Sequence, residues 1–269
     1  MRNDASDASP RVAEQALVAV RDFLSLHENT ASPSFLARLF GRRPIAPELK
    51  DQFRLACGEV AVVDALSQLG AEWMVFHTVP VGRGNHDLEY VVIGPAGVYS
   101  LTVRQHPGGA LWINEGVLLV DGEGMAHIRD AEFEAVRSCQ LLSEVVGSRV
   151  EVAPCLVISG ARSITVSKPP RRVAVLATRN LRSWLRDLPR LLSTETLATF
   201  RTAASEQADW QDTKSPSSDV AIQLERFRKV QSEINQARHT RLTWVTGVLV
   251  LAWLVAFVCV GGSATNLVG

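Results

Sequence analysis

The sequence lacks a net charge. Its 28 Lys and Arg residues balance its 28 Asp and Glu residues over a length of 269 residues. Proteins that bind the phosphate backbone of nucleic acids are usually basic. This charge balance therefore argues against strong, nonspecific binding of nucleic acids and is compatible only with a local basic surface. A chain of this length can form one medium-sized domain with appendages.

Cysteine is also scarce, and its spacing excludes the common zinc and redox motifs. Cys57, Cys139, Cys155 and Cys259 form neither a C-x-x-C pair nor a zinc-type pattern. Residues 1–15 lack the apolar core of a secretory signal peptide. We therefore expect reduced, isolated thiols that face the cytosol.

Charged residues are absent from Leu242 onward. The segment Leu242–Val260 reads LTWVTGVLVLAWLVAFVCV, and as a helix it would span about 28 Å, close to the roughly 30 Å of a hydrocarbon core. A buried core helix is the alternative, but the segment is apolar on every face and lies near the end of the chain. Trp244 suits a membrane interface. We therefore predict a transmembrane helix.

Basic residues precede this predicted span. Arg238, His239 and Arg241 lie before it, whereas residues 261–269 after it carry no charge. Positively charged flanks remain on the cytoplasmic side of membranes. The pattern therefore predicts a single-pass protein, anchored in the membrane by its tail, whose N-terminal domain lies in the cytoplasm.

The rest of the sequence alternates helical and strand patterns and predicts an α/β fold. Apolar residues at helical spacing predict helices over residues 11–26, 47–69, 130–146, 181–192, 194–204 and 220–241. Apolar runs bounded by turn residues predict strands over residues 73–79, 88–93, 98–104, 111–113, 117–120, 152–159 and 173–177. We divide the chain into an N-terminal helix and loop-rich segment (1–50), an α/β domain (51–206), a linker (207–219), a juxtamembrane helix (220–241), the transmembrane helix (242–260) and a short tail (261–269).

The stretch HDLEYVVIGPAGVYSLTVR carries the strongest functional signal. Gly94–Gly97 predicts a tight turn between two strands, because Pro presets one backbone angle and Gly tolerates unusual ones. Side chains two residues apart in a strand share a face, so Asp87 and Glu89 point the same way. Thr102 and Arg104 share a face on the next strand.

Glu59 lies on the preceding helix, in a position to close over this cluster. Hydrolysis of a phosphodiester with Mg²⁺ needs carboxylate ligands, and the metal then lowers the pKa of a water nucleophile. If the site is active, Glu59, Asp87 and Glu89 would bind Mg²⁺ or Mn²⁺. In the alternative, these residues have no catalytic role. Glu59 is then a solvated helix residue, and Asp87 and Glu89 form ion pairs with Arg104.

A Gly-Glu pair at residues 58–59, the acidic strand and the G-P-x-G turn within residues 87–98, and a closing order of strand, strand and helix occur together. From about residue 57 to about residue 192, this combination resembles the nuclease-related domain (NERD), a branch of the PD-(D/E)xK nuclease-like superfamily. The resemblance implies a restriction-endonuclease-like mixed sheet flanked by helices, and a metal-dependent nuclease site.

The chain departs from that family at the site itself. Glu89 replaces an Asp, Tyr90 a His and Arg104 a Lys. Thr102 replaces the acid, and its neutral hydroxyl is a poor ligand for Mg²⁺. Arg104 stays charged and cannot act as a base. These departures predict a vestigial catalytic site at Glu59, Glu89 and Arg104.

Histidine gives a weaker signal. His77, His86 and His106 lack the helical spacing or the Cys partner of a metal site. We therefore expect ordinary surface histidines.

Three functions fit these observations. The first is a membrane-anchored, NERD-like module that binds a protein partner, or nucleic acid weakly, and needs no cofactor. The second is an active nuclease that uses Mg²⁺ or Mn²⁺ on DNA or RNA. The third is a structural anchor, in which the juxtamembrane helix and the span assemble copies of the chain. We favour the first, because the glycines and apolar strands of the scaffold remain around a site that has lost its acid.

Overall fold

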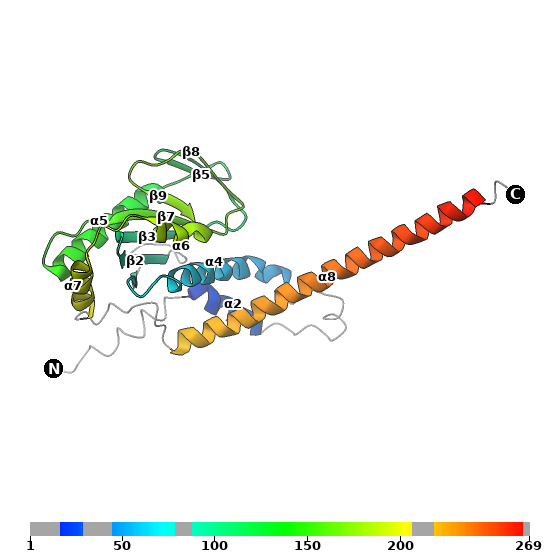
Figure 1. Ribbon diagram of the computed structural model, residues 1–269, viewed down its shortest axis with the longest axis horizontal. Helices are drawn as coiled ribbons and strands as arrows, with labels where there is room; N and C mark the ends of the chain where they lie inside the picture. The colour runs from blue at the N-terminus through cyan, green and yellow to red at the C-terminus, as the bar shows by residue number, and fades with distance from the viewer. Residues whose placement is uncertain (1–16, 29–44, 79–87, 206–217, 266–269) are drawn as a thin grey trace. The chain divides into compact units, whose positions relative to one another are not determined.

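The computed structural model describes residues 17–28, 45–78, 88–205 and 218–265 (Figure 1). The chain forms two compact units. The first comprises the chain up to Phe23 and Asp51–Leu224, and the second comprises Leu24–Lys50 and Glu225–Gly269. All the strands in the described residues belong to the first unit.

A five-stranded mixed sheet forms the centre of the first unit, in the order β1-β2-β3-β7-β9. Its strands are β1 (Met74–Thr78), β2 (Leu88–Gly94), β3 (Gly97–Gln105), β7 (Ala153–Ser159) and β9 (Ala174–Ala177). The first three form an antiparallel meander, to which β7 and then β9 add in parallel with β3. The carboxyl ends of β3, β7 and β9 therefore meet at one edge of the sheet, which we call the carboxyl edge.

A smaller sheet has the order β6-β5-β4-β8. Its strands are β4 (Ala110–Asn114), β5 (Val117–Val120), β6 (Glu123–Met125) and β8 (Ser163–Lys168). In Figure 1 this sheet lies beyond the end of β7 and β9. Its apolar side chains, such as Ile113 and Leu118, share a buried cluster with Ile158 of β7, so the small sheet is fixed to the carboxyl edge.

One face of the larger sheet carries α4 (Lys50–Ser67) and α6 (Thr178–Asp187), and we call it the α4 face. Leu66 and Leu181 of these helices are buried there in one cluster with Leu101 of β3. α4 begins after a short 3₁₀ turn at Pro47–Leu49, where proline is compatible with a helix start.

The other face, the α5 face, carries α5 (His127–Val146) and α7 (Thr194–Ser205). Leu142 of α5 and Phe200 of α7 are buried there with Val98 of β3. Because side chains alternate across a strand, each strand of the meander contributes to both clusters, and the sheet is a central layer between two helical layers.

At Gly58, α4 comes close to the carboxyl edge. A Cβ atom built on Gly58 would lie 2.8 Å from the Oγ of Ser159 and would also clash with the side chain of Gln105. Real Cβ atoms do not come this near to their neighbours. Glycine therefore lets α4 lie against the ends of β3 and β7.

α8 (Ser218–Thr265) is one helix of 48 residues. Its backbone is helical throughout the predicted span, so the predicted juxtamembrane helix and the predicted span form one continuous helix. The side chains of residues 254–260 lie outside the described residues. Where side chains of the span are described, Leu249 and Trp253 are 65% and 66% exposed. Among the described residues, we find no helix with the length and apolarity needed to cross a bilayer.

The remaining predicted elements match the structure with shifted ends. α2 (Val18–Glu28) overlaps the first predicted helix (11–26) but ends two residues later. α5 begins at His127 rather than at Asp130, and α6 occupies Thr178–Asp187 rather than residues 181–192. β6 and β8 were not predicted. Such shifts of a few residues at helix ends are expected when caps are weak, and α5 and α6 both lack a side-chain N-cap.

Candidate functional site

Among the described site residues, Glu59 lies on one face of the larger sheet, and Thr102 and Arg104 lie on the other. Leu101 of β3 is buried on the α4 face, so Thr102 and Arg104 point to the α5 face. Glu59 lies on α4, and its charge acts on Tyr90, which is buried on the α4 face. Contrary to the expectation that Glu59 closes over the hairpin cluster, the sheet lies between Glu59 and the two described members of that cluster, Thr102 and Arg104.

Glu59 caps the first turn of α2. Its two carboxylate oxygens accept hydrogen bonds from the backbone N–H groups of Ala19 and Val20, at 3.0 and 3.1 Å. These amides have no acceptor within their own helix, and the helix dipole favours a negative group beside them. The side chain is fully buried, so the alternative that Glu59 is a solvated helix residue is wrong.

Burial is the dominant influence on the titration of Glu59. It raises the pKa of this carboxyl from 4.5 to about 7, against the two backbone hydrogen bonds, which favour the charged form. The pKa of the neighbouring Tyr90 phenol is also raised, first by its own burial and then by the charge of Glu59. Near pH 7 Glu59 is therefore divided between its charged and neutral forms.

Thr102 is sealed inside the α5 face. Its side chain is fully buried, and its Oγ1 makes no hydrogen bond within the described residues. Ser100, two residues before it on the same face, lies against α5, where its Oγ is 3.4 Å from the Oγ of Ser138. A longer acidic side chain at position 102 would have to displace neighbours on this packed face.

Arg104 and two histidines gather where β3 ends and α5 begins. Arg104 is 7% exposed, and its guanidinium donates a hydrogen bond to the carbonyl of Val103 at 3.3 Å. The Nε2 atoms of His106 and His127 lie 2.9 Å apart, so one ring donates to the other. The predicted surface position of His106 is therefore only partly right, because this hydrogen bond is half-buried.

The charge state of this cluster follows from its packing. Burial, followed by the charges of Arg104 and His106, lowers the pKa of His127 from 6.5 to about 4. Asp130 opposes this shift, since its carboxylate lies 4.0 Å from Nδ1 of His127. At neutral pH the cluster thus pairs the permanent charge of the Arg104 guanidinium with a neutral His127 imidazole.

Asp87 lies outside the described residues, as does the side chain of Glu89. The backbone of Glu89 pairs with Thr102 across the antiparallel β2–β3 ladder. Within the part of the chain that the structure describes, no group of three or more His, Cys, Asp or Glu side chains is arranged to hold a metal ion.

His77 also departs from the expectation of a surface histidine. It is 8% exposed, and its ring lies edge-on to that of Tyr90, with 5.1 Å between the centroids. Neither ring nitrogen has a hydrogen-bond partner in the described residues. Burial lowers its pKa from 6.5 to about 4, so His77 behaves as a neutral core residue.

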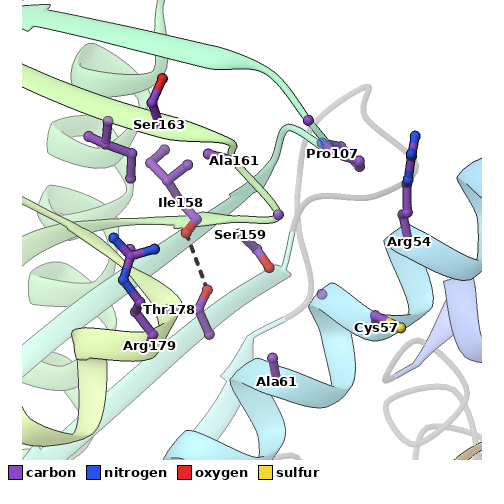
Figure 2. Close-up of a pocket in the computed structure, with 15 residues that line it drawn as sticks. Arg54, Cys57, Ala61, Pro107, Ile158, Ser159, Ala161, Ser163, Thr178 and Arg179 are labelled. Atoms are coloured by element: carbon purple, nitrogen blue, oxygen red, sulfur yellow. Dashed lines mark hydrogen bonds between the residues drawn. The ribbon is translucent and has the colours of Figure 1, made fainter. Parts of the chain in front are cut away.

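A cavity of about 540 Å³, which the sequence did not predict, opens on the α4 face at the carboxyl edge (Figure 2). α4 contributes Arg54, β7 contributes Ser159, and α6 contributes Thr178 and Arg179 from its first turn. The Thr178 hydroxyl donates to the carbonyl of Ile158 at 3.3 Å and thereby fixes the start of α6 against β7. In the sequence, Ser159 precedes a glycine outside any known nucleophile motif, so no signal marked it.

Comparisons of the chain with protein-family models, with curated proteins and with solved structures found no match.

Proposed function

We propose that the chain is a membrane-anchored, NERD-like protein whose nuclease site is vestigial and which acts as a binding or scaffolding module. The environment of β3 carries this proposal. Thr102 places a buried neutral hydroxyl, and Arg104 a buried positive charge, where the resemblance implies an acid and a Lys. A divalent cation needs carboxylate oxygens, and an adjacent fixed positive charge opposes its binding.

Glu59 adds to this argument. Both of its carboxylate oxygens are occupied by the backbone amides of Ala19 and Val20. A metal ion at Glu59 would compete with these two hydrogen bonds for the carboxylate oxygens, and buried amides that lose their acceptors are costly. The residue that the resemblance assigns to catalysis therefore has a structural role that is independent of chemistry.

The arrangement of the larger sheet supports a restriction-endonuclease-like fold. An antiparallel meander, β1-β2-β3, is followed after a helix by the parallel strands β7 and β9, with helices on both faces. The acidic strand and its neighbour in the resemblance correspond to β2 and β3. Their register pairs Glu89 with Thr102 and supports the assignment of both positions to one vestigial site.

The second half of α8 supports the membrane anchor. Val245, Leu249 and Trp253, all within the predicted span, are at least half exposed. Apolar surface of this extent is unfavourable in water, at about 25 cal/mol per Å², and a bilayer would cover it. The uncharged sequence of Leu242–Val260 and the basic residues before it are the basis for placing the first unit in the cytoplasm.

A cleavage assay tests the proposed loss of activity. The full-length chain in detergent would be incubated with plasmid DNA or RNA and with Mg²⁺ or Mn²⁺, beside an Asp87→Ala/Glu89→Ala variant as a matched control. We expect no cleavage above that of the control. Metal-dependent cleavage by the wild type that the double variant lacks would instead establish an active nuclease.

A thermal melt tests the proposed loss of metal binding. Anything that binds only the folded state raises its melting temperature in a saturable manner. We expect millimolar Mg²⁺ or Mn²⁺ to leave the melting temperature unchanged in the wild type and to raise it in a Thr102→Glu/Arg104→Lys variant. A saturable rise in the wild type would contradict the vestigial site.

Membrane fractionation tests the anchor separately. The full-length chain should stay with membranes during alkaline extraction, whereas a chain ending at residue 241 should not. Release of the full-length chain by alkali would refute the anchor without bearing on the nuclease site.

A further inference from the structure

We propose that the cavity on the α4 face binds the terminal phosphate monoester of a nucleoside. The cavity lies at the carboxyl edge, where β3, β7 and β9 end side by side. Ligands of open α/β sheets bind in the crevice beyond the carboxyl ends of parallel strands. The loops that leave β3 and β7 border it, at Pro107 and at Gly160.

The first turn of α6 supplies backbone donors to this cavity. α6 begins at Thr178, and the residue in the N-cap position, Ala177, has no side chain that can cap it. The initial N–H groups of a helix have no acceptor within the helix, and the helix dipole makes this end positive. Phosphate groups are the ligands that such uncapped helix starts bind in other folds.

Ser159 is a second and independent indication of a ligand. Its side chain is 2% exposed, yet it lines the cavity and makes no hydrogen bond within the described residues. Figure 2 shows it beside the start of α6, at the position that follows Ile158 in β7. Buried hydroxyl groups are normally paired. A phosphate oxygen at the α6 N-terminus would accept this hydrogen bond.

The charge of the cavity also favours an anion. Arg179 extends from the first turn of α6, and Arg54 lies on the opposite wall, where it also pairs with Asp51 at 3.1 Å. None of the described residues that line the cavity is acidic. The guanidinium of Arg179 and the N-terminus of α6 thus make this end of the cavity positive, whereas the charge of Arg54 is already compensated by Asp51.

The size and the apolar wall indicate more than inorganic phosphate. A volume of about 540 Å³ is within the range of small-molecule sites, roughly 300–1,000 Å³. Pro107, Ile158 and Ile164 form an apolar part of the lining. A nucleoside would fill this part while its phosphate contacts the donors. The phosphate is carried either by a free nucleotide or by the 5′ end of a strand.

This inference is independent of the proposed vestigial nuclease. The cavity is on the α4 face, whereas Thr102 and Arg104 belong to the α5 face. The result of the cleavage assay therefore does not bear on the phosphate site. Likewise, a failure to bind phosphate would not bear on the missing acid at position 102.

Titration calorimetry with the full-length chain in detergent tests the ligand class. The probes are adenosine 5′-monophosphate, inorganic phosphate, adenosine, and a short oligonucleotide with either a 5′-phosphate or a 5′-hydroxyl. We expect adenosine 5′-monophosphate to bind at least tenfold more tightly than adenosine, or the 5′-phosphorylated oligonucleotide at least tenfold more tightly than the 5′-hydroxyl one. Whichever phosphorylated probe binds more tightly identifies whether the phosphate comes from a free nucleotide or from a strand end. Equal binding with and without the phosphate, or no binding of either, would overturn the proposal.

Three substitutions locate the site. Ala61, an exposed residue of α4 that lines the cavity, accepts either charge without disturbing the core. Ala61→Glu should weaken binding about tenfold and Ala61→Lys should not, because only the first repels the phosphate. Ser159→Ala should also weaken binding about tenfold through the lost hydrogen bond.

The matched control is Arg186→Ala, at the other end of α6, where Arg186 pairs with Asp187 at 3.1 Å. It should leave affinity unchanged. The melting temperature without ligand separates a folding defect from a binding defect in each variant. If both changes at Ala61 affect binding equally, or if Ser159→Ala retains full affinity, the site is not where we place it.

Discussion

Oε1 of Glu59 lies 3.0 Å from the backbone nitrogen of Ala19, although forty positions separate the two residues in the sequence. A carboxylate that the family resemblance assigns to metal chemistry thus serves as the N-terminal cap of α2. The contact connects a segment near the start of the chain to the first helix of the α/β domain.

Replacing Glu59 should therefore destabilise the fold. Glu59→Ala leaves two buried amides without acceptors and should lower the free energy of unfolding by about 2–3 kcal/mol. Denaturant unfolding monitored by circular dichroism measures this loss. Glu59→Gln, which keeps one oxygen acceptor, should lose less. A Glu59→Ala variant as stable as the wild type would show that the cap contributes nothing.

Stability should also depend on pH through Glu59. Its pKa is raised from 4.5 in the unfolded chain to about 7 in the fold, so the folded state retains the proton over this interval. Its contribution to stability is complete below pH 4.5 and is lost as pH rises through about 7. The stability of the wild type relative to Glu59→Gln should fall between pH 4.5 and 7.5 and then level off. A constant difference would contradict the raised pKa.

His77 should be replaceable with a gain in stability. Within the part of the chain that the structure describes, its two ring nitrogens are buried without partners, and such groups cost about 1–3 kcal/mol each. His77→Phe preserves the ring and its contact with Tyr90, and should raise the free energy of unfolding by about 1 kcal/mol at pH 7.

The gain from His77→Phe should grow in acid. Because the pKa of His77 is lowered to about 4, the neutral ring contributes stability above pH 6.5, and this contribution is lost as pH falls towards 4. Melting curves at pH 7 and pH 5 measure the change. A variant that is less stable at both values would mean that His77 has a partner in solution.

Thr102 offers the same test on the α5 face. Its hydroxyl is buried and unpaired within the described residues, so Thr102→Val, which keeps the shape, should stabilise the fold by about 1 kcal/mol. Thr165→Val on the exposed side of β8 is the matched control and should change stability by less than about 0.5 kcal/mol. Destabilisation by Thr102→Val would indicate that the hydroxyl has an acceptor after all.

Local sequence patterns predicted the hairpin of the site well. The turn at Gly94–Gly97 and the apolar strands around it reappear as β2 and β3, because proline, glycine and β-branched residues specify such a hairpin by themselves. β8 escaped prediction for the opposite reason. Most of its side chains are exposed, so Ser163–Lys168 shows no burial pattern that a sequence would reveal.

The packing of Glu59 and Ser159 could not be predicted in the same way. Helical periodicity identified α4 but not the sheet face that it covers, since that depends on how α4 and α6 pack together against the strands. The cap on α2 joins residues that are distant in the sequence. The cavity likewise forms from four separate segments of the chain. None of these segments carries a sequence motif that indicates a binding site.

The missing side chain at Gly58 has a consequence for selectivity. α4 already lies directly against Ser159 and Gln105 at that point. This wall of the cavity therefore cannot move inward to contact a smaller ligand. Any larger residue at position 58 would push the helix outward and enlarge the opening. The absence of a Cβ atom at Gly58 thus sets the size of ligand that the cavity can accept.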